Sequence, residues 1–167
     1  MKTISIKDAQ RLSGPQPFAL LVTADAQGKP NIMAISWWTY ASNNPPALIV
    51  CLGENSYSSE LIQSGNEFTL CVVGSGMKGA GFACGTCSGR TVDKAEKFSV
   101  ALADSQIVRP PYVRDSRIVL ECRVTAQAEA GNHTAFIASV VAAHGDETTD
   151  QLFALDGYAR LGTLAQT

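Results

Sequence analysis

The stretch Asn31–Ser58 constrains the fold of this chain more strongly than any other part of it. It contains two apolar runs, Ile32–Tyr40 and Ala47–Leu52, that are rich in β-branched and aromatic residues. A cluster of turn-forming residues, Ser42–Pro46, separates the two runs. Because β-branched and aromatic side chains favour extended backbone, this pattern predicts two consecutive strands joined by a turn.

Small polar residues gather where these two strands are expected to end. Hydroxyl groups and free backbone N–H groups hold a phosphate without a strong local charge, so the pattern suits an anionic cofactor. The same residue types also form turns through their own hydrogen bonds, and that alternative stays open at this point. The residues are Asn31, Ser36 and Ser42 around the first run, and Asn55, Ser56, Ser58 and Ser59 after the second.

Length, charge and cysteine content limit the classes of protein that fit. A chain of 167 residues predicts one domain over residues 1–167, with a core that needs no disulfide or metal. The net charge of −2 and the pI of about 5.6 provide no basic surface for nucleic acid or anionic lipid. No apolar run is long enough to span a membrane, and Met1–Gly14 is too charged for a signal peptide, so we expect a cytoplasmic protein. The five cysteines are expected to be mostly reduced thiols.

The order of the expected elements indicates an all-β-dominated fold. Roughly seven strands with short helices between them favour a β-barrel or sandwich over a βαβ array. The segment Gly74–Gly89 is glycine-rich and is expected to be irregular, with at most one helical piece. Short helices are expected at Ile6–Leu12, with Ser5 as N-cap, at Ser56–Gln63, capped by Ser56 or Ser58, and at Thr91–Lys97. Besides the two runs above, extended segments are expected at Phe18–Ala24, Glu67–Val73, Val108–Tyr112, Arg117–Ala128 and His133–Ala143, and a short final element at Leu152–Tyr158.

The residues Gly74–Gly79 match the G-x-G-x-x-G pattern of dinucleotide-binding loops. That motif needs a crossover helix directly after it, but each glycine of Gly81–Gly85 costs about 1 kcal/mol relative to alanine in a helix. Asp93 lies at the right distance, yet the charged residues Lys94–Lys97 follow it where a second buried strand should have just ended. This context argues against a Rossmann site.

Cys84 and Cys87 form a C-x-x-C motif. Zinc or an iron–sulfur cluster needs three or four thiolates with suitable spacing, and Cys51, Cys71 and Cys122 lie singly in expected strands, so no metal site is expected. A thioredoxin-like role would place the motif at the start of a helix in a βαβ unit, which is missing. We interpret the motif as two thiols in a glycine-rich loop, with a reversible disulfide as the alternative.

Two further groups of polar residues have both a functional and a purely structural interpretation. Arg90 and Lys94 place two cations after a glycine-rich loop, where they suit a phosphate or a solvated helix start with Asp93 near its positive end. His133 opens one strand and His144 lies at the far end of the same strand. Two such histidines do not make a metal site, and a histidine at a strand end is commonly a polar terminus.

In order and spacing, these pieces resemble the flavin reductase-like FMN-binding split-barrel family, and within it the flavoredoxin-like proteins. The resemblance runs from about Pro17 to Tyr158, nearly the whole chain. Each piece is short, and their order and spacing together carry the match. The pieces are Pro17–Thr23, Gly28–Asn31, Ala34–Trp37, Ser42 with Pro45-Pro46, Ser56–Ser58, Glu67-Phe68, Ser88–Arg90 with Asp93-Lys94, Glu121-Cys122, and Gly131-x-His133.

The resemblance implies a six-stranded FMN-binding split β-barrel with short peripheral helices, which works as a homodimer with one FMN per subunit near the interface. It places the flavin ring on the strand Asn31–Trp37 and the phosphate near Gly53–Ser58. Because the flavin carries the redox chemistry, no catalytic residue is expected in the protein. The C-x-x-C is outside the family pattern. The implied cofactor-binding residues are Asn31, Met33, Ala34, Ile35, Ser36, Trp37, Cys51, Leu52, Gly53, Ser56, Tyr57, Ser58, Arg90 and Lys94, with His133 on the nicotinamide side.

The expected function is that of an FMN-dependent oxidoreductase that passes electrons from NADH or NADPH to a free flavin, a ferric complex, oxygen or a protein. One alternative is an electron-carrier flavoprotein that does not react with nicotinamide. A second alternative, from a different class, is a non-catalytic split-barrel protein that binds another ligand or serves a structural role. The sequence leaves the final acceptor and the choice between NADH and NADPH open.

Overall fold

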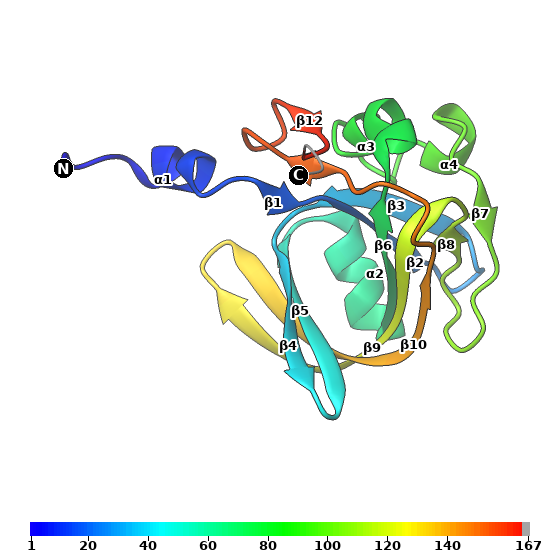
Figure 1. Cartoon of the computed structure of the whole chain (residues 1–167). Coiled ribbons are helices and arrows are strands. Elements are labelled where there is room, and N and C mark those ends of the chain that lie inside the picture. Colours follow the sequence, from blue (N-terminus) through cyan, green and yellow to red (C-terminus); the bar gives the residue numbers. More distant parts are fainter. Residues whose placement is uncertain (165–167) are drawn as a thin grey trace.

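A sheet of seven antiparallel strands forms the centre of the computed structural model, which describes residues 1–164 (Figure 1). The strand order across this sheet is β3-β2-β6-β9-β10-β5-β4. The long hairpin β9–β10 and the strand β6 were predicted from the sequence, and the structure confirms them. The strands are β2 (Ala19–Ala24), β3 (Pro30–Ile35), β4 (Trp38–Asn43), β5 (Pro46–Gly53), β6 (Glu67–Val73), β9 (Ser116–Ala130) and β10 (His133–Gly145).

The run Ile32–Tyr40 was predicted as one strand, and this prediction was wrong. The chain breaks at Ser36 and Trp37 into β3 and β4, which occupy the two opposite edges of the sheet. Only two residues join these edges, so the sheet must curl until the edges meet, and a barrel results. The turn at Asn44-Pro45 joins β4 to β5. Since β3 and β4 are halves of one bent strand, the seven-stranded sheet matches the six-stranded barrel that the resemblance implies.

Strand β2 is buried on both of its faces because two separate apolar cores lie on either side of it. Leu20 and Val22 point into the core beneath α3 and α4, whereas Ala19 and Leu21 point into the core inside the barrel. Side chains on β3 also alternate between the two cores: Ile32 belongs to the first core, and Met33 packs against the second. This double burial explains why Phe18–Ala24 reads as a continuous apolar run.

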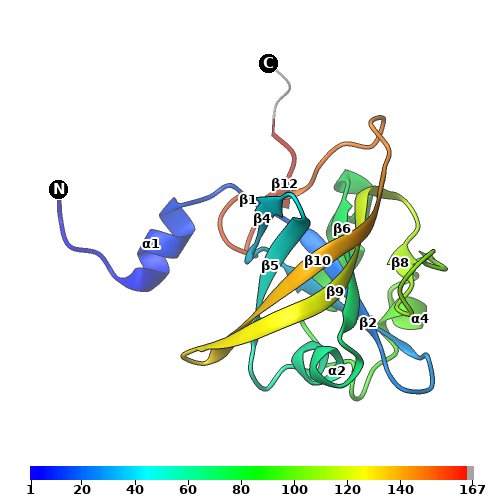
Figure 2. The same ribbon diagram turned by 90° about the horizontal axis from the view of Figure 1, so that it is seen from below.

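Four α-helices and one 3-10 helix accompany the barrel in the described chain. Ser5 caps the first of them as predicted, and this helix buries none of its residues and stands away from the barrel (Figure 2). Part of the glycine-rich segment forms α3, although the sequence predicted mostly irregular backbone there. None of the helices within residues 1–164 combines the length and the apolar content that a membrane crossing requires. The helices are α1 (Ile6–Leu12), α2 (Tyr57–Gly65), η1 (Ser75–Met77), α3 (Lys78–Cys84) and α4 (Lys94–Lys97).

Short strands complete the architecture beside the barrel. A three-stranded sheet of order β1-β11-β12 ties the N-terminal arm to the C-terminal segment, and β7 pairs with β8. The strand β6, which precedes the glycine motif, pairs antiparallel with both β2 and β9, so the βαβ context of a dinucleotide fold is absent there. The short strands are β1 (Gln16–Pro17), β7 (Leu102–Ala103), β8 (Tyr112–Val113), β11 (Phe153–Ala154) and β12 (Leu161–Gly162).

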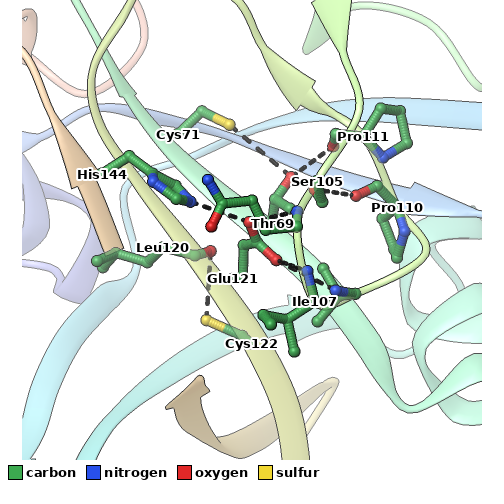
Figure 3. A network of polar contacts seen from close by, with 12 residues as sticks. Thr69, Cys71, Ser105, Ile107, Pro110, Pro111, Leu120, Glu121, Cys122 and His144 are labelled. Carbon is green, nitrogen blue, oxygen red and sulfur yellow. Dashed lines mark hydrogen bonds and ion pairs between the residues drawn. The ribbon is translucent and has the colours of Figure 1, made fainter. Parts of the chain in front are cut away.

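A buried carboxylate, Glu121 on β9, anchors the loop before β8 to the barrel (Figure 3). Its two oxygens accept hydrogen bonds from the backbone N–H groups of Gln106, Ile107 and Val108 at 2.7–3.1 Å, and one oxygen lies 3.0 Å from His144 Nε2. Burial raises the pKa of Glu121, but the hydrogen bonds outweigh it, and the net shift is downward. The side chain is therefore ionised and fully hydrogen-bonded in the fold.

Candidate functional site

Two adjoining cavities lie along β3 and share Met33 and Ala34 in their walls. The first has a volume of about 430 Å³ and lies where β3, the start of α2 and the loop after α3 come together. The second, of about 250 Å³, lies between β3, β5 and the start of β10. Of the residues predicted from the sequence, the first cavity is lined by Asn31, Met33, Ala34, Ser56, Tyr57, Ser58, Arg90 and Lys94. The second is lined by Met33, Ala34, Ile35, Trp37, Cys51, Leu52, Gly53 and His133.

Lys94 is a buried cation in the wall of the first cavity, with 5% of its surface exposed. Its ammonium group donates hydrogen bonds to the backbone carbonyls of Ile32 and Cys84, at 2.8 and 2.7 Å. Burial lowers the pKa of Lys94. An ammonium group carries three N–H donors, and no Asp or Glu of the described chain lies within ion-pair distance of it. One donor and an uncompensated positive charge are thus available to a ligand.

The N-terminus of α2 also faces the first cavity. Ser56 is the N-cap, and its hydroxyl accepts a hydrogen bond from the backbone N–H of Ser59 at 3.1 Å. The Ser58 hydroxyl is buried and accepts from Asn31 Nδ2 at 2.8 Å. Both hydroxyls act as acceptors in these bonds, and each keeps its O–H donor. The two serines shape the helix start, and the first backbone N–H groups of the helix provide the anion-binding dipole.

Asn31 links β3 to this helix start, and Gly89 lies directly against it. The side-chain amide nitrogen of Asn31 also donates to Thr23 Oγ1 at 3.2 Å. The Oδ1 atom of Asn31 is buried and has no hydrogen-bond donor in the described chain. A Cβ atom on residue 89 would come within 1.9 Å of that oxygen. Only glycine therefore allows the loop to approach β3 this closely.

Arg90 closes the outer side of the first cavity. Its guanidinium group donates to Glu60 Oε2 at 2.7 Å and to the carbonyl of Asn55 at 3.3 Å, and it lies 5.2 Å from the centre of the Tyr57 ring. The sequence left two interpretations of Arg90 and Lys94 open, namely cations for a phosphate or a solvated helix start, and each applies to one of the two residues. Lys94 is a buried cavity cation, whereas Arg90 is an exposed residue that already has a carboxylate partner.

The second cavity carries an aromatic pair. The rings of Trp37 and His133 lie with centroids 4.9 Å apart, although Trp37 remains 40% exposed. His133 Nδ1 lies 2.7 Å from Asn132 Oδ1, which orients the imidazole. The two rings are tilted by 41° to each other, and a half-exposed aromatic pair of this kind can contact a planar ring system.

Of the cofactor-binding residues that the resemblance implies, Ser36 alone lines neither cavity, and the polar residues Ser42 and Ser59 line neither as well. The Ser36 hydroxyl donates to the Tyr158 hydroxyl at 3.3 Å, and Ser36 lines a separate hollow of about 360 Å³ with Trp37, Trp38 and Cys51. Ser36 sits where β3 ends and the barrel closes. Its hydrogen bond therefore ties the C-terminal segment to that bend.

Several wall residues escaped the sequence analysis. Tyr158 reaches the second cavity from the C-terminal segment, which carries no motif of its own. The two cysteines of the C-x-x-C were interpreted as residues of a loop, yet both line the first cavity. The described residues contain no cluster of three or more side chains that could hold a metal ion. Asn55, one of the polar residues noted after the second apolar run, also lines the first cavity. The wall residues that the prediction did not include are Cys84, Gly85, Thr86, Cys87, Ser88, Gly89 and Tyr158.

Residues 13–162 match the family model of the flavin reductase like domain. An uncharacterized protein of Archaeoglobus fulgidus is 34% identical over 123 residues, which cover 73% of this chain and 70% of that protein. The reductase component of a 4-nitrophenol 4-monooxygenase/4-nitrocatechol 2-monooxygenase from Rhodococcus opacus is 30% identical over 124 residues. That match covers 74% of this chain but only 63% of the Rhodococcus protein.

The fold also matches solved structures. A flavoredoxin from Methanosarcina acetivorans superposes with a TM-score of 0.86 at 25% sequence identity. This match covers 100% of the present chain and 94% of the flavoredoxin chain. The split-barrel architecture that the sequence predicts is therefore confirmed.

Proposed function

The chain belongs to the flavin reductase-like domain family, and from this premise we propose that it is an FMN-binding oxidoreductase that accepts electrons from NADH or NADPH. The observation that carries the proposal is the buried Lys94 ammonium, which lines the first cavity without a carboxylate partner. A buried cation is costly unless an anion compensates it. A flavin phosphate supplies such an anion.

The residues present fit this group. The phosphate would be held by Lys94 and by the N-terminal N–H groups of α2, whose geometry Ser56 fixes as N-cap. The ring would lie along β3, over Met33 and Ala34, which both cavities share.

Bound flavin supplies two-electron transfer between a nicotinamide and an acceptor. The protein would bind and orient the flavin ring. The apolar floor of β3 excludes water from one side of the site, and the half-exposed Trp37 leaves the other side open. His133, next to Trp37, lies where a second planar ring would enter. We assign it to contact with the nicotinamide.

Two relatives favour different acceptors. The similarity to the Rhodococcus reductase component favours delivery of electrons to a free flavin or to a partner enzyme. The similarity to the Methanosarcina flavoredoxin, which extends over the whole of this chain, favours an electron carrier that another protein reduces. We place the reductase first because the Trp37–His133 surface provides room for a nicotinamide.

We also propose that the protein works as a homodimer. The outer face of β4, β5 and β10 presents a half-buried row of small and apolar side chains, in which Cys51 pairs with Ala135 and Ile49 pairs with Ile137. The second cavity opens beside this row at Trp37 and Cys51. A second copy on this face would cover the open side of the ring site.

The proposal is tested by the cofactor and by Lys94. The purified protein should be yellow and should release FMN, not FAD, on denaturation. Lys94→Met should weaken FMN binding by about 10- to 150-fold, because a hydrogen bond to a charged group contributes about 1.5–3 kcal/mol. Riboflavin, which lacks the phosphate, should bind both proteins nearly equally.

Lys97→Met, an exposed change on the same helix, is the matched control and should leave FMN affinity unchanged. Equal losses of FMN and riboflavin affinity would show that the phosphate does not lie at Lys94. Anaerobic mixing with NADH or NADPH then separates the reductase from the electron carrier, because only the reductase loses its yellow absorbance. A colourless protein that takes up no added FMN would leave the non-catalytic alternative.

A further inference from the structure

Two thiols line the wall of the first cavity. Cys84 is the last residue of α3 and is fully buried, and Cys87, three residues later, is half-buried. Both face the cavity that carries Lys94. Cys84 also belongs to the first apolar core, with Cys71, whereas Cys122 lies in the second; neither Cys71 nor Cys122 is among the residues that line the first cavity.

The backbone between the two cysteines continues as a turn after α3. The N–H of Gly85 donates to Phe82, and the N–H of Thr86 donates to Ala83, both at 3.0 Å. Cys84 and Cys87 lie three residues apart across this turn. A disulfide needs Cβ atoms roughly 3.5–4.5 Å apart, so joining the two cysteines requires the turn to bring their side chains within that distance.

The two thiols differ in accessibility. Burial raises the pKa of the Cys84 thiol to about 11, although the positive charge of Lys94 lowers this pKa in part. Cys87 is the more exposed of the two and is the thiol that a reaction partner in the cavity meets first. In thiol–disulfide exchange one sulfur reacts first and a second sulfur resolves the mixed disulfide, and we assign the first role to the accessible Cys87 and the second to Cys84.

We propose that Cys84 and Cys87 form a dithiol–disulfide pair that exchanges two electrons with the flavin bound in the same cavity. This inference rests on the proposed function. Reduced flavin gives two electrons and two protons to the Cys84–Cys87 disulfide: the S–S bond breaks, two S–H bonds form and the flavin is left oxidised. In the reverse direction the dithiol loses two electrons and two protons to oxidised flavin. Each subunit thereby stores two electrons in addition to those on its flavin.

The test is an anaerobic dithionite titration of flavin-loaded protein that has been oxidised with ferricyanide and desalted. The wild type should take up about four electrons per flavin, and Cys87→Ser should take up about two, since a disulfide is a two-electron couple. Cys122→Ala, which removes a thiol from the barrel core, is the matched control and should still take up about four.

Mass spectrometry of the wild type alone gives a second measurement. Iodoacetamide added in denaturant should leave Cys84 and Cys87 unlabelled in the oxidised protein and should label both after stoichiometric reduction of the bound flavin and the disulfide. A flavin-loaded wild type that takes up only two electrons, or that is labelled at both cysteines before reduction, overturns the dithiol proposal alone. A wild type that binds no flavin refutes the proposed function, and this proposal with it.

Discussion

Gly89 and Asn31 are in such close contact that any side chain at position 89 would displace the asparagine amide. A Cβ atom there would lie 1.9 Å from Asn31 Oδ1 and 2.8 Å from its Cγ. These atoms belong to a buried side chain that is held by Thr23 and Ser58, so they have little room to move. This contact sets the distance between the loop after α3 and the strand β3.

Gly89→Ala should therefore weaken both the fold and the cofactor site. Displacing Asn31 breaks two neutral hydrogen bonds, which contribute together about 1–3 kcal/mol to the free energy of unfolding. Urea denaturation measures this loss, and FMN titration should show a raised Kd. Gly76→Ala, at a glycine with open space around it, is the control and should change neither quantity. An unchanged FMN Kd in Gly89→Ala would mean that the loop does not shape the site.

The two serines at the start of α2 should contribute to stability as well as to FMN binding. Ser56→Ala removes an N-cap, which costs about 1 kcal/mol, and Ser58→Ala leaves the Asn31 amide without its nearest acceptor, which costs about 1–3 kcal/mol. Both changes should lower the unfolding free energy and the affinity for FMN. Ser64→Ala, at the other end of α2, should leave FMN affinity at the wild-type value. If Ser56→Ala and Ser58→Ala bind FMN normally, the phosphate lies elsewhere.

Glu121 should make the fold sensitive to acid. Its pKa is lowered in the folded state, so its contribution to stability is complete above the ordinary value of 4.5 and is lost as the pH falls through the lower folded value. Glu121→Gln should destabilise the protein by about 2–4 kcal/mol at pH 7, because the amide places an N–H group against backbone N–H donors. The gap between the two proteins should shrink below pH 4.5 in urea denaturation. A constant gap from pH 7 to pH 3 would show that Glu121 is not ionised in the fold.

His133→Ala should raise the KM for NADH or NADPH and leave the FMN content unchanged. A neutral hydrogen bond contributes about 0.5–1.5 kcal/mol, so the expected increase is about 2- to 13-fold. His144→Ala is the informative contrast, because His144 contacts Glu121 and not the second cavity. It should lower thermal stability without changing KM. Unchanged kinetics of His133→Ala with both nucleotides would exclude His133 from the nicotinamide site.

Local sequence patterns determined the parts of this protein that depend on neighbouring residues. Ser5 and its following residues predicted α1, and the apolar run Glu67–Val73 predicted β6, because caps and strand preferences act over a few residues. The order and spacing of short motifs also indicated the family. Nearly all of the cofactor-binding residues named from these motifs line the walls of the two cavities.

Contacts between distant residues decided the rest. Lys94 reaches the carbonyl of Ile32, 62 positions away in the chain, and no local pattern distinguishes such a buried lysine from a solvated one at a helix start. The break at Ser36 has the same origin, because an apolar run continues through it and only closure of the barrel bends the chain there. Cys84 and Cys87 became cavity residues because the loop after α3 folds back onto β3. Sequence periodicity specifies which faces are apolar, whereas only the packed fold specifies which polar groups then meet in one cavity.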